Sequence, residues 1–335
     1  MCLRQRTRDH LGKAAGVRIR GAPRRPFRAR PQAAPVPDQG TEDDHVRTDE
    51  LVEALDAYFR VPEVATDDWA PVFEALYPHQ YWREYAEPGY EGRWNGLMVR
   101  GSEEVGRAAT CVFPSDEIVA GLEPGTFLFA EHPIDLANGD VFTPLARDTF
   151  ELLHKRAVSF YNVHAPLDQH PEVSPSRLIA GAIGIEDAEE YFPIAPEIPG
   201  GAAVIGEVNS SVEQVTERLQ AFLGPEIPVV IAARAGHRAG RVAVVGGGGA
   251  QSEILEESLT RGCETYVTGN AASPCPIPKV QASIAAFRAL ATEAGVSVVD
   301  GTHYGTEKPP QLAMADWFRA RGVPADFVPG RPERE

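Results

Sequence analysis

Histidine and carboxylate side chains recur four residues apart at two places in this sequence. His164 and Asp168 close the stretch SFYNVHAPLD, and His303 and Glu307 lie in THYGTE, each pair after a short apolar run. His132 follows a third apolar run, in TFLFAEHP. In parallel α/β sheets, ligands bind at the carboxyl ends of the strands. The repeated pattern therefore favours a common site over polar residues that merely follow a strand into solvent.

These residue types indicate a metal site. Imidazole nitrogen and carboxylate oxygen without sulfur suit Zn, Fe, Mn, Co or Ni better than calcium or a thiolate cluster. The five candidates, with Glu131 as a sixth, exceed what one catalytic ion usually takes. Two divalent ions about 3.5–4 Å apart, bridged by a carboxylate and a water, would use such a set. Asp168 and Glu307 are the candidate bridging groups, and the activated water is the candidate nucleophile.

Other catalytic motifs are less well supported. No GxSxG motif is present, and no cysteine stands where a Cys-His pair would need it. In VAVVGGGGAQSE, Gln251 takes the third glycine place of a dinucleotide fingerprint, and no GK[ST] follows. The loop is interpreted either as a tight strand-to-helix turn or as an anion or substrate contact at a helix N-terminus. Asn270 and Tyr304, beside the second ligand pair, are candidates for substrate contacts.

The elements that must position these residues alternate between helix and strand from about residue 46. Apolar spacing and capping residues predict helices over residues 48–59, 115–122, 145–156, 251–262 and 280–295. Short apolar runs predict strands over residues 96–101, 107–113, 126–133, 157–163, 241–249, 264–270 and 296–301. Such alternation predicts an α/β fold with a largely parallel sheet.

The two halves of the chain follow a similar plan. KRAVSFYNVHAPLD and EAGVSVVDGTHYGTE each contain a helix end, a strand that opens with Val-Ser, and a histidine four residues before an acid. The sequence thus predicts two similar α/β domains, over residues 46–195 and 196–330, with the metal site in the cleft between them. Residues 1–45 are expected to form a disordered, basic, Pro- and Arg-rich tail.

Composition limits the partners. The chain has 335 residues, 43% of them apolar, and a net charge of −16, although its first 40 residues carry ten Lys or Arg and only two acids. So acidic a body argues against a nucleic-acid partner recognised through its phosphates, and no run of about 20 apolar residues predicts a membrane span. Four scattered cysteines and no secretory signal favour a cytoplasmic protein. His154 and His170 are interpreted as surface residues.

The order of several motifs resembles a known family. WNGLMVRG, EHP, YNVHAPLD, VAVVGGGG, YVTGN and DGTHYGTE, within about residues 48–322, resemble the Nif-three-like dinuclear metal-centre family, the NGG-one-interacting-factor-three group often labelled GTP cyclohydrolase 1 type 2. The resemblance implies a two-domain α/β fold, a two-metal site in the interdomain cleft and a toroidal homohexamer. It implies as metal ligands His132, His164, Asp168, His303 and Glu307. Two positions depart from the family pattern: Glu131 stands where many members have histidine, and Asn270 replaces the acid of TGE.

Three functions remain open at this stage. The family label implies a metal-dependent hydrolase in which an activated water attacks the imidazole ring of a purine nucleotide or a related small-molecule substrate. The alternatives are a metal carrier or chaperone, and a regulatory interaction protein whose metals are structural. Turnover that depends on His164 would favour the hydrolase, whereas exchangeable metal without turnover would favour the carrier.

Overall fold

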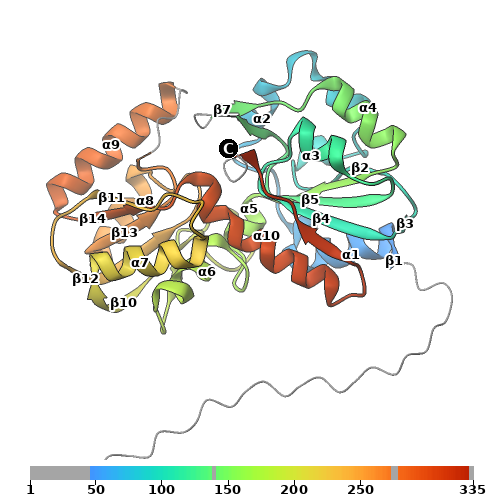
Figure 1. Cartoon of the computed structure of the whole chain (residues 1–335). Coiled ribbons are helices and arrows are strands. Elements are labelled where there is room, and N and C mark those ends of the chain that lie inside the picture. Colours follow the sequence, from blue (N-terminus) through green and yellow to red (C-terminus); the bar gives the residue numbers. More distant parts are fainter. Residues whose placement is uncertain (1–45, 138–140, 273–277, 332–335) are drawn as a thin grey trace, which may run out of the picture. The chain divides into compact units, whose positions relative to one another are not determined.

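Two mixed β-sheets, flanked by helices, carry the fold of the described chain (Figure 1). The computed structural model describes residues 46–137, 141–272 and 278–331, with the exception of the side chain of residue 279. The expected tail over residues 1–45 lies outside these residues. Among the helices described, none is long and apolar enough to cross a membrane.

The first sheet has five strands. Their order across the sheet is β15 (Ala325–Phe327), β4 (Arg107–Cys111), β5 (Thr126–Ala130), β8 (Ser159–Asn162) and β2 (Gly96–Val99). Strands β15, β4, β5 and β8 are parallel, and β2 runs antiparallel to β8. Because helices cover the sheet, β5 and β8 are buried along their whole length, and their sequences, TFLFA and SFYN, do not alternate between apolar and polar residues.

The second sheet has six strands and repeats the plan of the first. Their order is β11 (Val230–Ala233), β14 (Ser297–Asp300), β13 (Thr265–Thr268), β12 (Arg238–Val245), β10 (Ala203–Ser211) and β9 (Glu189–Tyr191). Strands β12, β13 and β14 are parallel, and β11 is antiparallel to β14, as β2 is to β8. The mixed α/β fold and the similarity of its two sheets, both predicted from the sequence, are confirmed.

Ten α-helices, three 3₁₀ helices and four short strands complete the described elements; the 3₁₀ helices are η1 (Val61–Glu63), η2 (Pro78–Glu84) and η3 (Tyr90–Gly92). The helices are α1 (Thr48–Phe59), α2 (Ala70–Leu76), α3 (Asp116–Gly121), α4 (Arg147–Lys155), α5 (Ala165–Asp168), α6 (Pro175–Ile183), α7 (Val212–Leu223), α8 (Ser252–Thr260), α9 (Pro278–Ala294) and α10 (His303–Arg319). The short strands β1 (Val46–Arg47) and β3 (Glu104–Val105) pair with each other, as do β6 (Asp135–Ala137) and β7 (Val141–Thr143). A Ser211/Gln214 capping box starts α7.

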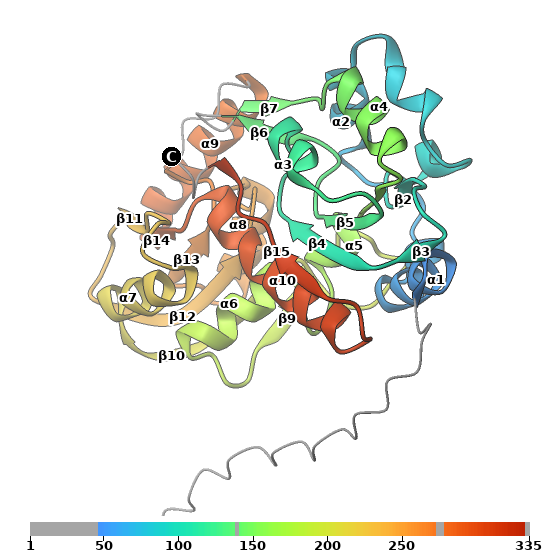
Figure 2. The same ribbon diagram turned by 45° about the vertical axis from the view of Figure 1, so that its right-hand side comes forward.

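Helix α10 joins the two sheets (Figure 2). It begins just after β14 of the six-stranded sheet and leads into β15 of the five-stranded sheet. Its residue Tyr304 belongs to the hydrophobic core beside the six-stranded sheet, whereas Met314 and Phe318 pack with Phe127 and Phe129 of β5. Strand β9, before residue 195, likewise pairs within the six-stranded sheet. The chain therefore passes between the sheets at α6–β9 and again through α10.

One expectation about the surface is wrong. His170 is 8% exposed, and its ring lies 4.3 Å from that of Tyr58 and 5.4 Å from that of Phe59, measured between ring centroids. Its Nε2 lies 3.2 Å from the carbonyl oxygen of Tyr58. The residue follows α5 and fills the space beside α1, so a polar side chain after a short helix is here part of the core. His154 is exposed, as expected.

Candidate metal centre

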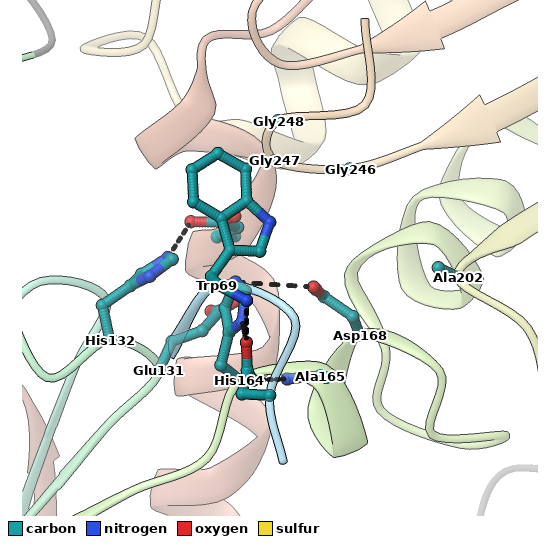
Figure 3. Close-up of polar contacts among 12 residues, drawn as sticks. Trp69, Glu131, His132, His164, Ala165, Asp168, Ala202, Gly246, Gly247 and Gly248 are labelled. Atoms are coloured by element: carbon teal, nitrogen blue, oxygen red, sulfur yellow. Dashed lines mark hydrogen bonds and ion pairs between the residues drawn. The ribbon is translucent and has the colours of Figure 1, made fainter. Parts of the chain in front are cut away.

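The six predicted metal ligands converge from three strand ends. Glu131 and His132 follow β5 directly, His164 lies two residues after β8, and His303 opens α10 three residues after β14. Figure 3 shows the side chains of His132, His164 and Asp168 pointing toward one another. Both sheets thus contribute residues to one centre, as expected where the carboxyl ends of parallel strands meet.

Glu307 lies at the middle of this centre. Its Oε1 is 2.9 Å from His303 Nε2, and its Oε2 is 3.0 Å from His132 Nε2. Ligand atoms of His132, His303 and Glu307 all lie within 4.8 Å of one another, and so do those of Glu131, Asp168 and Glu307. One carboxylate is therefore shared by a nitrogen-rich group and an oxygen-rich group, which is the arrangement that a bridged pair of ions requires.

His164 is braced by a residue that the sequence analysis missed. The buried carboxylate of Asp67 lies 3.0–3.1 Å from His164 Nδ1 through both of its oxygens. It also accepts hydrogen bonds from the backbone N–H groups of Trp69 and Ala165. An ionised carboxylate only accepts, so Nδ1 carries the proton and Nε2 is directed toward Asp168 Oδ2, 3.8 Å away. A carboxylate behind a histidine is a frequent support of metal ligands.

Asn95 completes this support, and it too was missed. Its side-chain oxygen accepts a hydrogen bond of 2.7 Å from the backbone N–H of His164, and its amide nitrogen lies 3.4 Å from Asp67 Oδ2. Asp67 sits in a loop before α2, 97 residues from its partner, and no local periodicity marks it. Asn95 lies within the motif WNGLMVRG, but nothing in the sequence of that motif indicates a contact with His164.

The electrostatics of the centre differ from group to group. Burial, followed by the carboxylates of Glu307 and Asp168, raises the pKa of Glu131 well above its usual range. Burial raises the pKa of Asp168 to about 7, against the attraction of the His164 imidazole. Burial also opposes the ionisation of Glu307, but His303 and His132 hold its pKa well below the usual value. Glu131 and Glu307 are buried and Asp168 is half-buried, and three acids this close together repel one another unless a positive charge lies between them.

The pKa values of His132 and His164 are shifted in opposite directions. Burial lowers the pKa of His132 to about 4, although Glu307 acts against it. Burial also acts to lower the pKa of His164, but the attraction of the Asp67 carboxylate is stronger and raises that pKa to about 9. The same pairing, against burial, lowers the pKa of Asp67 to about 2. Asp67 is thus ionised at neutral pH and is the strongest charge partner of His164.

The donor set fits divalent transition-metal ions. Glu131 is fully buried, and its Oε1 has no hydrogen-bond partner among the described residues; the same holds for His132 Nδ1. Glu131 Oε2 accepts a hydrogen bond of 3.1 Å from Gln311, one turn beyond Glu307 on α10. A buried polar atom without a partner is costly. A cation bound by Glu131, Asp168 and Glu307 would give Glu131 Oε1 a partner and would offset the repulsion among the three carboxylates.

The start of α10 is held in an unusual conformation. Thr302 has φ +63°, which a β-branched residue seldom adopts, and its hydroxyl caps the helix by accepting from the backbone N–H of Gly305. Its own N–H donates to Asp300 at 2.9 Å. Such strain persists only where the surroundings enforce it, and it is concentrated at functional sites. Here it turns the chain so that His303 faces the centre.

The glycine loop after β12 packs against the same helix. Gly247 has φ +57°, and a Cβ there would collide with the carboxylate of Glu307. Its N–H donates to Thr306 Oγ1 at 2.8 Å. The loop is therefore a tight turn with close backbone approach, which was one of the two interpretations of its sequence. Asn270 Oδ1 accepts from the backbone N–H of Ala250 at 2.8 Å and so holds the end of this loop.

A cavity of about 320 Å³ opens beside the centre. Its lining includes His132, His164, Asp168, His303 and Glu307, together with the glycine loop and several aromatic residues. Neither Asn270 nor Tyr304, the predicted substrate contacts, occurs among the described residues that line it. Tyr304 is buried, and its hydroxyl accepts a hydrogen bond from the backbone N–H of Gly330. Their substrate role stays a prediction.

Known proteins share this fold. The protein TTHA1606 from Thermus thermophilus superposes with a TM-score of 0.58 at 24% identity, over 84% of this chain and 98% of that one. Reduced HcgD from Methanocaldococcus jannaschii superposes with a TM-score of 0.57 at 17% identity, over 86% of this chain and 98% of that one. At these identities the likeness shows the fold alone.

Curated relatives share the sequence at low identity. The GTP cyclohydrolase 1 type 2 homolog of Archaeoglobus fulgidus is 29% identical over 237 residues, which cover 70% of this chain and 88% of that protein. The homolog of the same name from Escherichia coli strain K12 is 25% identical over 228 residues, 67% of this chain and 83% of that protein. The model of one family, Duf34/NIF3, matches residues 66–327, from the segment of Asp67 to the end of β15. The motifs around the centre thus predicted the relationship correctly, and the chain belongs to the Duf34/NIF3 (NGG1p interacting factor 3) family.

Proposed function

We propose that this chain holds two divalent transition-metal ions and acts as a metal-dependent hydrolase on a purine nucleotide or a related heterocyclic substrate. The observation that carries the proposal is the position of Glu307, whose carboxylate contacts both His132 and His303 and also lies within the acidic group of Glu131 and Asp168. The adjoining cavity gives a substrate access to these side chains.

The residues divide into two ligand groups. His132, His303 and Glu307 would hold one ion, and Glu131, Asp168 and Glu307, with His164 Nε2, would hold the other. When bound, such a pair of divalent ions lowers the pKa of a coordinated water and polarises a substrate oxygen or nitrogen. The ions are drawn from Zn, Fe, Mn, Co and Ni, because the donors are imidazole nitrogen and carboxylate oxygen.

The chain itself prepares the donors. Asp67 keeps the proton of His164 on Nδ1 and so leaves Nε2 facing the centre. Gln311 donates to one oxygen of Glu131, and the other has no hydrogen-bond partner among the described residues and is left for an ion. Phe113 stacks on His132 at 4.1 Å between ring centroids and an interplanar angle of 3°, which fixes the plane of that imidazole. These contacts hold the donors in place before an ion arrives.

The name shared by the curated relatives, GTP cyclohydrolase 1 type 2 homolog, supports the choice of substrate class. An enzyme of that kind opens the imidazole ring of a purine by addition of water. Buried acids and histidines beside a cavity are suited to the proton transfers that such a reaction needs.

Elemental analysis followed by an activity panel tests the proposal. Protein purified without chelator should contain about two metal ions per chain, and loaded protein should hydrolyse at least one of GTP, GDP, guanosine or a model phosphoester. Chelation should abolish turnover, a specific metal should restore it, and Glu307→Gln should lack it. Glu256→Gln, an exposed change of the same kind on α8, is the matched control.

Three outcomes would overturn this function. Full activity in metal-free protein would exclude the metal mechanism. Readily exchangeable metal without turnover under any loading would favour the carrier. Tightly held metal without turnover would favour a regulatory protein with structural metals.

A further inference from the structure

The cavity beside the centre has an aromatic wall. Trp69 precedes α2, Phe142 lies on β7 and Phe192 follows β9, and all three are half-buried and line the cavity. The rings of Trp69 and Phe142 meet edge to face with their centroids 6.3 Å apart, and Phe142 lies 5.8 Å from the ring of His303. Three segments distant in the sequence thus supply flat apolar surface next to the predicted ligands.

Phe192 is held in a conformation that aromatic residues seldom adopt. Its φ is +57°, in the left-handed region that favours glycine. The backbone N–H of Ala202 donates to the carbonyl oxygen of Phe192 at 3.1 Å and helps to keep it there. Strained residues of this kind are concentrated at ligand sites. The Phe192 side chain therefore lines the cavity although its backbone conformation is strained.

The glycine loop supplies the facing surface. Gly246, Gly248 and Gly249 line the same cavity as Trp69, and Figure 3 labels the loop and the indole in one view of the site. Without side chains, the loop presents bare backbone to whatever enters. A Cβ at Gly248 would lie 3.8 Å from His303 and 3.9 Å from Asn270, so it would project into the space near the ligands. A flat ligand can approach such a surface closely.

The charge of the lining opposes anions. Its carboxylates are Asp67, Asp68, Asp168, Glu253 and Glu307, and no Lys or Arg occurs among the described residues that line it. The N-terminus of α8 faces this space and would otherwise favour a phosphate, but its first turn carries Glu253. Phosphate chains are usually held by guanidinium or ammonium groups, and the described residues of this lining supply neither.

Bound metal would not reverse this balance. Two divalent ions bring four positive charges, and the four buried or half-buried carboxylates of Asp67, Glu131, Asp168 and Glu307 offset them. Asp68 and Glu253 are exposed and remain negative at the rim. A triphosphate, with several negative charges of its own, would have to pass these two acids.

We propose that the cavity binds an uncharged planar heterocycle, a purine base or nucleoside, between its aromatic wall and the glycine loop, and that it discriminates against nucleoside triphosphates. The inference rests on the proposed function in that it names the substrate class of the same site. It departs from the substrate in the relatives' shared name, because aromatic stacking and an acidic lining suit a base better than a polyphosphate.

Binding of guanosine and GTP to full-length protein, with zinc loaded and after chelation, tests the inference by calorimetry. Guanosine should bind at least roughly ten times more tightly than GTP in both states. It should also quench tryptophan fluorescence, because Trp69 is half-buried at the cavity whereas Trp82, Trp94 and Trp317 are buried. Equal or tighter binding of GTP, or no binding of guanosine, would overturn the proposal.

Variants separate stacking from charge. Trp69→Ala should weaken guanosine binding roughly tenfold, and Trp69→Phe, which keeps a ring and guards against loss of folding, should retain most of it. Glu253→Gln should strengthen GTP binding severalfold, whereas Glu256→Gln on the same helix, outside the cavity lining, should not. Unchanged guanosine affinity in both Trp69 variants would overturn the stacking argument.

The outcomes also distinguish this inference from the proposed function. Tight GTP binding with turnover would support the hydrolase and overturn the discrimination. Nucleoside binding without turnover of any compound would support the cavity assignment and overturn the hydrolase.

Discussion

The two histidine–carboxylate pairs have the same spacing in the sequence but different geometry in the structure. His303 Nε2 and Glu307 Oε1 are 2.9 Å apart in the first turns of the 17-residue helix α10. His164 Nε2 and Asp168 Oδ2 are 3.8 Å apart, where His164 is the residue before the four-residue helix α5 and Asp168 is its last residue. Aspartate is one methylene shorter than glutamate and reaches less far from a comparable backbone. The pairs are therefore equivalent in position but not in reach.

The two pairs also differ in what holds them. His164 is held by polar side chains, namely the carboxylate of Asp67 and the amide of Asn95. Glu307 is enclosed by backbone, because Gly247 lies against its carboxylate and hydrogen-bonds to Thr306. A motif of fixed spacing can thus be supported by hydrogen bonds in one half and by close packing in the other. Metal binding by the His164 pair should therefore be sensitive to loss of the Asp67 charge. The packing around Glu307 should be sensitive to a methyl group added at Gly247.

The largest effect is expected where the two groups of ligands meet. Glu307→Gln keeps the shape of the side chain but removes the charge shared by His132 and His303, so affinity for both ions should fall more than roughly 100-fold. Asp168→Asn should weaken mainly one ion. Zinc titration by calorimetry and elemental analysis measure both. If both variants lost the same affinity for both ions, the two histidine–carboxylate pairs would not differ in their contribution to metal binding.

Packing around the second pair can be tested with one methyl group. Gly247→Ala should lower the free energy of unfolding by about 3 kcal/mol, from a positive φ and a collision with Glu307. Gly295→Ala is the matched control, because Gly295 has φ +68° and, its two chain neighbours aside, no atom of the described residues lies within 4 Å of the added carbon. It should cost only about 1 kcal/mol. Urea unfolding measures both, and equal costs would show that contact with Glu307 contributes nothing.

Support of the first pair depends on a charge. Asp67→Asn keeps only one oxygen, so one of the two backbone N–H groups of Trp69 and Ala165 loses its acceptor, and His164 loses its ionised partner. Affinity for one ion should therefore fall roughly 10–100-fold. Asp148→Asn on α4 is the control and should leave metal affinity nearly unchanged, since Asp148 is exposed and is not among the described residues that line the cavity. Calorimetric zinc titration of the two variants measures whether Asp67 contributes to metal affinity. Equal affinities would remove Asp67 from the support of the centre.

Much of this arrangement was predictable because it is local. The parallel strands are buried on both faces and appear as apolar runs, so the sequence marks their carboxyl ends, where His132, His164 and His303 stand. Four-residue spacing on a helix brings a histidine and an acid to one face, which is again a local property. The family motifs further indicated the order in which these strands and helices follow one another along the chain.

The remainder depends on contacts between distant segments. Asp67 and His164 are 97 residues apart, and the carboxylate sits in a loop that has no periodic pattern. Strand β15 has three residues and pairs with β4, more than 200 positions earlier, so nothing in its own sequence assigns it to the first sheet. His170 shows the converse, a polar residue in a loop that packing against Tyr58 places in the core.

The smallest effect is expected at Tyr304, beside His303, and it decides whether the second half contributes a substrate contact. The Tyr304 hydroxyl accepts from the backbone N–H of Gly330, and the side chain is 2% exposed. Tyr304→Phe leaves that N–H without this partner, so the free energy of unfolding should fall by about 1 kcal/mol. Metal stoichiometry and guanosine affinity should stay unchanged, because the ring keeps its place in the core and does not line the cavity. A several-fold loss of guanosine affinity with unfolding unaltered would instead assign Tyr304 the substrate contact predicted from the sequence, and the cavity would then have to extend toward the end of β15.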